Sequence, residues 1–114
     1  MIDLQETINQ LGGKGFNGAL VYTGVSEIAI VDKSNEQNDG CIGFKVNGKK
    51  GYKWIITIAL DWNDTYTVTL IQLRGKDKQY LDVKNNVYCD ELQDVFETMY
   101  DNAIKKHCGG FIHI

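Results

Sequence analysis

The stretch IALDWNDTYTVTL, residues 58–70, decides the fold of this chain. Apolar and polar residues alternate on both sides of DWND, which is typical of two β-strands joined by a tight turn. Because paired antiparallel strands share their apolar face, we expect Ile58 to lie opposite Val68. This register predicts a three-residue hairpin loop at residues 62–64.

The same patterns predict the remaining elements. Asp3 should cap a short helix that Gly12-Gly13 ends, and Asp90 should cap a long amphipathic helix that runs through Ile104. Asn47-Gly48 is typical of a hairpin turn, which the following lysines could lengthen. Strands are expected at residues 19–22, 28–31, 41–46, 52–60, 66–73 and 79–83. The chain is therefore expected to form one α+β domain, residues 1–114, with an antiparallel sheet of five to six strands and both helices packed on it.

One segment breaks the alternation. Tyr66, Val68 and Leu70 share a face, but Ile71 and Leu73 place apolar side chains on the other one. Two explanations remain open: a β-bulge near Leu70, or a strand that is covered on both faces.

Composition limits the classes of protein. The 114 residues are 43% hydrophobic and 24% charged, which suits one soluble domain. There is no apolar run approaching ~20 residues and no basic start, so neither a membrane span nor a secretory signal is expected. Three cysteines without close pairing favour a reducing cytoplasm over a disulfide framework. A net charge of −3 is too small to indicate a nucleic-acid binder by itself.

Motifs for catalysis or metal binding are weak. No phosphate-binding glycine loop, dinucleotide motif or nucleophile elbow occurs, so we expect no enzyme. Asp61 and Asp64 could act as general acid and base, but turn formation explains both better. His107, Cys108 and His113 lack the paired spacing of a zinc site, so no metal and no cofactor are expected.

Trp62 is the residue that turn chemistry does not explain. It either folds back over the sheet edge as part of the core, or it stands out as an anchor for a partner. Both alternatives stay open at the level of sequence.

Charges are expected to separate along the molecule. Seven of the 12 cations should meet at one end of the sheet: Lys45, Lys49, Lys50, Lys53, Arg74, Lys76 and Lys78. Tyr52, Trp54 and Tyr80 lie nearby, so this end could grip a nucleic-acid backbone and stack a base. The acidic residues of the last helix, spaced four, three and four apart, should form one stripe: Asp90, Asp94, Glu97 and Asp101. That stripe could imitate the phosphates of a duplex.

Several short phrases occur here in a familiar order. They are LGG at 11–13, YTG at 22–24, IALDWNDTY at 58–66, LRG at 73–75 and VYCDEL at 87–92. Over roughly residues 8–100 the chain resembles a group of small uncharacterised proteins of phages and integrated mobile elements of gut bacteria. The resemblance implies a small cytoplasmic protein of a mobile element. Inhibitors of host defence, including anti-CRISPR proteins, are frequent among such proteins.

These observations lead to one expected function and one alternative. The first is a non-enzymatic protein, monomer or homodimer, that occludes a host protein or nucleoprotein complex such as a CRISPR nuclease. Its partner-binding surface would combine Asp61, Trp62 and Asp64 with the acidic stripe. The alternative is a nucleic-acid-binding accessory protein that uses the seven cations.

Overall fold

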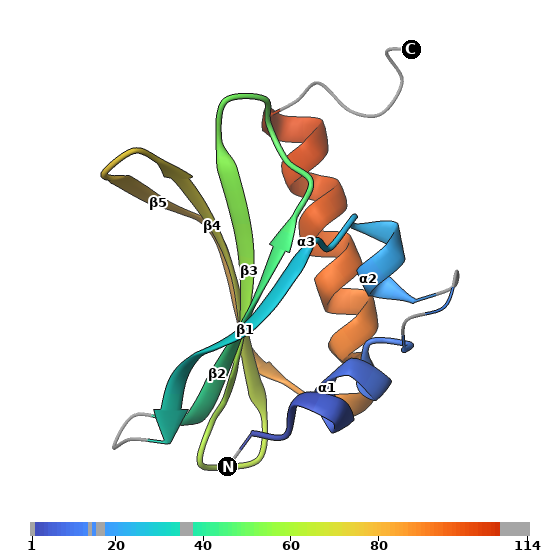
Figure 1. Cartoon of the computed structure of the whole chain (residues 1–114). Coiled ribbons are helices and arrows are strands. Elements are labelled where there is room, and N and C mark those ends of the chain that lie inside the picture. Colours follow the sequence, from blue (N-terminus) through green and yellow to red (C-terminus); the bar gives the residue numbers. More distant parts are fainter. Residues whose placement is uncertain (1, 14, 16–17, 35–37, 108–114) are drawn as a thin grey trace.

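The protein is an antiparallel sheet with helices on one face, as the computed structural model shows (Figure 1). The structure describes residues 2–13, 15, 18–34 and 38–107, and among residues 32–34 it describes the backbone only. The helices are α1 (Leu4–Gln10), α2 (Ala19–Tyr22), the 3-10 turn η1 (Cys89–Glu91) and α3 (Leu92–His107). The strands are β1 (Glu27–Ser34), β2 (Asp39–Val46), β3 (Lys53–Leu60), β4 (Tyr66–Arg74) and β5 (Asp77–Val87). The predicted α+β class is confirmed.

The five strands are arranged in chain order, β1-β2-β3-β4-β5, and each pairs antiparallel with the next. In Figure 1 the three α-helices lie together on one side of this sheet. No described segment covers the opposite face. Hairpin connections of this kind need only short loops, and the described loops between β2 and β3 and between β4 and β5 contain glycine, at Gly48, Gly51 and Gly75.

The register predicted from residues 58–70 is confirmed. Ile58 pairs with Val68, and the ladder between β3 and β4 runs without interruption from Leu60↔Tyr66 to Lys53↔Leu73. Because the ladder stays regular, Ile71 and Leu73 face away from the helices. The irregularities lie in the pairing of β4 with β5 instead, between Tyr66 and Val68 and between Leu70 and Ile71.

The core lies between the sheet and α3. Phe96 of α3 packs edge-on against Phe44 of β2, with ring centroids 5.6 Å apart, and both side chains are fully buried. Trp54 is also fully buried and packs edge-on against Tyr100 at 6.4 Å. Its indole N–H donates to Gln72 Oε1 at 3.0 Å, so burial leaves no unpaired donor.

Residues 19–22 were expected to form a strand, and that prediction is wrong. They form the single helical turn α2, in which Ala19 and Leu20 are buried and Tyr22 is half exposed. Thr23 closes the turn, because its N–H and its hydroxyl both donate to the carbonyl of Ala19. A four-residue apolar run fits one helical turn as well as it fits a short strand, so periodicity could not distinguish them.

Several boundaries also differ from the predictions, and β1 and β2 are longer than residues 28–31 and 41–46. The helix cap expected at Asp90 is absent, because η1 precedes α3 and the Glu91 carboxylate accepts from the Tyr88 N–H at 3.2 Å. The last strand is longer than residues 79–83, since β5 pairs with β4 along its whole length. Asn47-Gly48 does not make a two-residue turn, and the β2–β3 loop extends to residue 52. A Cβ on Gly48 would lie within 2.4 Å of the Trp54 ring, so this loop packs closely on the core.

Candidate functional site

The turn between β3 and β4 presents Trp62 to solvent. Its side chain is 58% exposed, so the structure favours the anchor alternative over the core alternative. The Asp61 N–H donates to the Thr65 carbonyl at 2.8 Å, and the Asp64 N–H donates to the Asp61 carbonyl at 3.1 Å. Asp64 has a φ of 64°, a left-handed conformation that Asp and Asn tolerate better than most residues. The backbone around the indole is therefore fixed.

Side chains reinforce this turn. Thr67 Oγ1 donates to Asp61 Oδ2 at 2.8 Å, and Thr65 Oγ1 donates to Asn63 Oδ1 at 2.8 Å. Asp61 thus ties the turn to β4, and Asp64 supplies its left-handed residue. The structural interpretation of the two aspartates accounts for their positions without a cleft or a catalytic partner.

The acidic stripe runs along α3, away from the Trp62 turn. The pair Tyr66↔Val87 places this turn and η1 at the same end of the sheet, so Asp90 lies at the Trp62 end. Asp94 borders a surface groove between α3 and β5. Glu97 accepts a hydrogen bond from the Gln93 amide at 2.9 Å, which engages it within the helix. The stripe is therefore not one uniform free surface.

Asp101 takes part in an interaction that the sequence did not indicate. It accepts a hydrogen bond of 2.6 Å from the Tyr22 hydroxyl, which joins α2 to α3. This bond, together with desolvation and the negative charge of Asp101, raises the pKa of Tyr22 to about 12. The carboxylate is thus part of the fold as well as of the stripe. Elsewhere in the core, burial raises the pKa of Tyr66.

The seven predicted cations do meet at one end of the sheet, opposite the Trp62 turn. They come from the end of β2, the β2–β3 loop, the start of β3 and the β4–β5 hairpin: Lys45, Lys49, Lys50, Lys53, Arg74, Lys76 and Lys78. The C-terminus of α3 also reaches this end, because the His107 ring lies 6.2 Å from the Trp54 ring. Lys105 and Lys106 therefore join the cluster, which holds nine of the 12 Lys and Arg residues. We call this set the basic end.

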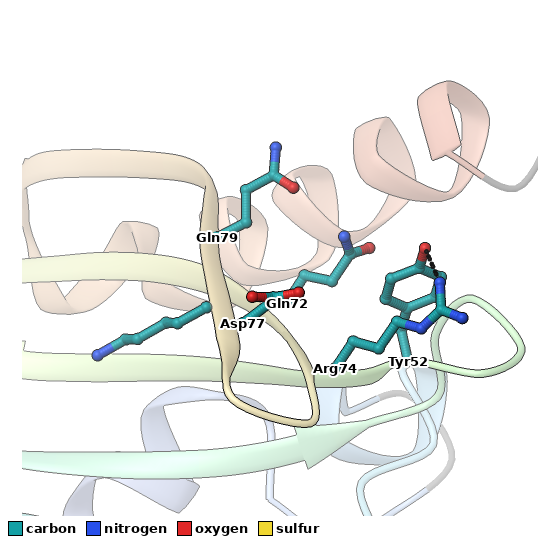
Figure 2. Close-up of a pocket in the computed structure, with 6 residues that line it drawn as sticks. Tyr52, Gln72, Arg74, Asp77 and Gln79 are labelled. Atoms are coloured by element: carbon teal, nitrogen blue, oxygen red, sulfur yellow. Dashed lines mark hydrogen bonds between the residues drawn. The ribbon is translucent and has the colours of Figure 1, made fainter.

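Figure 2 shows a pocket at the basic end, on the side of the sheet where α3 lies. Its volume is about 460 Å³, and its lining is almost entirely polar: Tyr52, Gln72, Arg74, Asp77, Lys78 and Gln79. The Arg74 guanidinium donates to the Tyr52 hydroxyl at 3.1 Å (Figure 2). Asp77 contributes one negative charge, so the pocket is only partly suited to anions.

Aromatic rings at the basic end are paired with cations. Lys49 Nζ and Arg74 Cζ each lie 5.2 Å from the Tyr52 ring centroid, and Lys78 Nζ lies 5.1 Å from that of Tyr80. Such contacts hold flexible cations in place. Trp54 cannot stack a base here as we expected, because it is fully buried in the core. Tyr52 and Tyr80 remain the candidates for stacking.

Sequence reasoning missed a hollow on the helix-free face. It has a volume of about 500 Å³, and its lining mixes apolar side chains with threonines: Val31, Asn38, Cys41, Ile55, Thr57, Thr69, Ile71, Leu73, Lys78 and Tyr80. The sequence feature that pointed to this hollow was the change in the parity of the apolar residues at Ile71. Its meaning depended on whether β4 or β5 carried the bulge.

The next question is whether side chains in the described residues could bind a metal ion. Residues 2–13, 15, 18–34 and 38–107 contain no group of three or more His, Cys, Asp or Glu side chains placed to hold a metal. Among the described residues, neither Cys41 nor Cys89 takes part in a disulfide. Cys108 and His113 lie outside the described residues. Within the described part of the chain, no helix is long and apolar enough to cross a membrane.

Comparison with known proteins finds no matching family model, no similar curated protein and no similar solved structure.

Proposed function

We propose that this chain is a non-enzymatic binding protein whose Trp62 turn anchors a protein partner. The observation that carries this proposal is a large aromatic side chain, 58% exposed, on a turn that hydrogen bonds hold in one conformation. Folding does not account for such exposure, because a three-residue turn needs no tryptophan.

The energetics of association favour this arrangement. A tryptophan buries a large area while few rotatable bonds lose freedom, so it is enriched among interface hot spots. Asp61 and Asp64 fix the turn before binding, which reduces the entropy lost on association. A hydrophobic anchor on a preformed turn therefore gains affinity from a small contact area.

The proposed partner is a host protein or nucleoprotein complex, of which a CRISPR nuclease is an example. Asp90 and Asp94 lie at or near the same end as Trp62 and would extend the contact with negative charge. Channels that hold nucleic acid are positively charged, so an aromatic anchor with acidic neighbours complements them. The chain would then act by occlusion in the bacterial cytoplasm.

An affinity capture from host lysate tests the class of partner. The tagged protein is incubated with lysate that has or has not been treated with nuclease, and retained proteins are quantified. We expect one partner to stay bound after nuclease treatment, because protein contacts carry the binding. Loss of every partner with nuclease would contradict the proposal and favour the second candidate.

The second candidate is nucleic-acid binding by the basic end. The observation that favours it is the clustering of nine cations around Tyr52 and Tyr80 despite a net charge of −3. Such a site would neutralise backbone phosphates and stack bases without sequence preference.

Gel shifts at low salt test this candidate with single- and double-stranded DNA and RNA. Binding should weaken steeply as salt rises, since each phosphate contact releases counterions. Reversing Lys49, Lys50 and Lys76 to glutamate should abolish the shift, whereas Lys84→Glu, outside the cluster, should retain it. Absence of any shift at low salt, with every nucleic acid tried, would exclude the candidate.

A further inference from the structure

The sheet face opposite the helices exposes several large apolar side chains to solvent. Ile71 is only 9% exposed although no described segment covers it, because neighbouring side chains surround it on the face itself. Val31, Tyr80 and Val83 share this face and are 54%, 59% and 49% exposed. Contiguous apolar surface on a sheet generally marks an interaction site.

On β2 and β3 the charges of this face follow a regular order, and Glu27 of β1 adds a negative charge beside Lys45. β2 has Asp39 at one end and Lys45 at the other, and both share the strand parity of Cys41 in the hollow. β3 has Lys53 at its start, and Asp61 follows its end with the same parity. Because β2 and β3 are antiparallel, the two lysines lie at one end of the face and the two aspartates at the other.

Geometry limits what can cover such a face. A twisted sheet is superposable on itself by a two-fold axis that lies in its mean plane, so a second sheet of the same twist fits against it. Two such axes exist. An axis along the strands would place the lysine ends of both copies together, and repulsion between these like charges disfavours that arrangement. An axis across the strands places the lysine end of each copy over the aspartate end of the other.

We propose that the helix-free face binds a second copy of this chain, with the strands of the two sheets antiparallel. Lys53 of each copy then faces Asp61 of the other, whereas Lys45 lies over Cys41, two residues from Asp39 along the facing strand. The Lys53–Asp61 pair should contribute more, because Glu27 already partly neutralises Lys45, with its Oε1 3.8 Å from Lys45 Nζ. The axis passes close to Thr57, which lies midway between Lys53 and Asp61 along β3.

The available area indicates a weak dimer. Five strands about 4.8 Å apart, each of about eight residues with a rise of ~3.3 Å, present roughly 600 Å² per copy. The interface would bury about 1,200 Å² in total, which is the lower limit for specific interfaces. We therefore expect association in the micromolar range.

Sedimentation velocity over a concentration series up to ~100 µM, which spans a micromolar Kd, tests the proposal with the full chain. The wild type should convert from monomer to dimer. Thr57→Lys should remain monomeric, because two lysines would meet at the axis. Thr98→Lys makes the same change at an exposed position of α3 and should dimerise like the wild type.

A charge exchange tests the antiparallel arrangement independently of Thr57. Lys53→Asp should weaken the dimer at least about tenfold, because it faces Asp61 of the partner copy. Adding Asp61→Lys should restore the dimer, with thermal midpoints measured for both variants. A wild type that stays monomeric, a Thr57→Lys dimer of normal affinity, or a failed restoration in a folded double variant would each overturn the proposal.

Discussion

Single hydrogen bonds set the behaviour of several residues that look ordinary in the sequence. Tyr22 illustrates this point, because its hydroxyl donates to Asp101, 79 positions later in the chain. The bond stabilises the protonated phenol relative to the phenolate. It therefore connects the ionisation of one side chain to the docking of α2 on α3.

The stability that this bond gives should depend on pH above 10. The pKa of Tyr22 is about 12 in the folded protein, against 10.0 as its ordinary value. The stabilisation is therefore complete below pH 10 and is lost as pH rises toward 12. Spectrophotometric titration should show late phenolate steps from Tyr22 and from the buried Tyr66, and the Tyr22 step should disappear in Tyr22→Phe and persist in Tyr88→Phe. A titration that Tyr22→Phe leaves unchanged would contradict the role of Asp101.

At the residue scale the sequence was informative about the turn and silent about its exposure. Alternation around DWND determined the register and placed Asp61 opposite Thr65. Whether Trp62 folds back depends on side-chain contacts that no local pattern encodes, so both alternatives stood until the structure showed 58% exposure. The role of Asp101 depended on a contact between distant segments and was equally inaccessible.

At the element scale, α3 holds the fold together. Its buried residues Phe96 and Met99 were predicted from the helical period and are confirmed in the core. The elements that were mispredicted are short or irregular, such as α2 and the 3-10 turn before α3. The structure of a long periodic segment can be predicted from its pattern, whereas the structure of a four-residue segment depends on tertiary contacts.

Phe96→Ala should therefore reduce the free energy of unfolding by ~3–5 kcal/mol, because it removes a fully buried ring and leaves a cavity beside Phe44. Chemical denaturation measures this change. Thr98→Ala, at an exposed position of the same helix, should stay within about 0.5 kcal/mol of the wild type. A small loss for Phe96→Ala would show that α3 does not pack on the sheet as described.

At the scale of the whole molecule, the chain has two poles and one uncovered face. The hairpin register places the Trp62 turn at one pole and the predicted cations at the other, so this separation was predictable from sequence. Two features were not predictable. The C-terminus of α3 adds Lys105 and Lys106 to the basic end, and the regular β3–β4 ladder turns Ile71 and Leu73 toward the helix-free face.

The central claim is that Trp62 serves binding and not folding. Trp62→Ala tests it when thermal stability and retention of the captured partner are measured on the same preparation. We expect stability within about 0.5 kcal/mol of the wild type and binding weaker by ~2 kcal/mol or more. Tyr80→Ala removes another exposed ring, nearer the opposite end of the sheet, and should leave both quantities near the wild-type values. A variant that loses stability while its folded fraction binds normally would show that Trp62 belongs to the core, and would contradict the account.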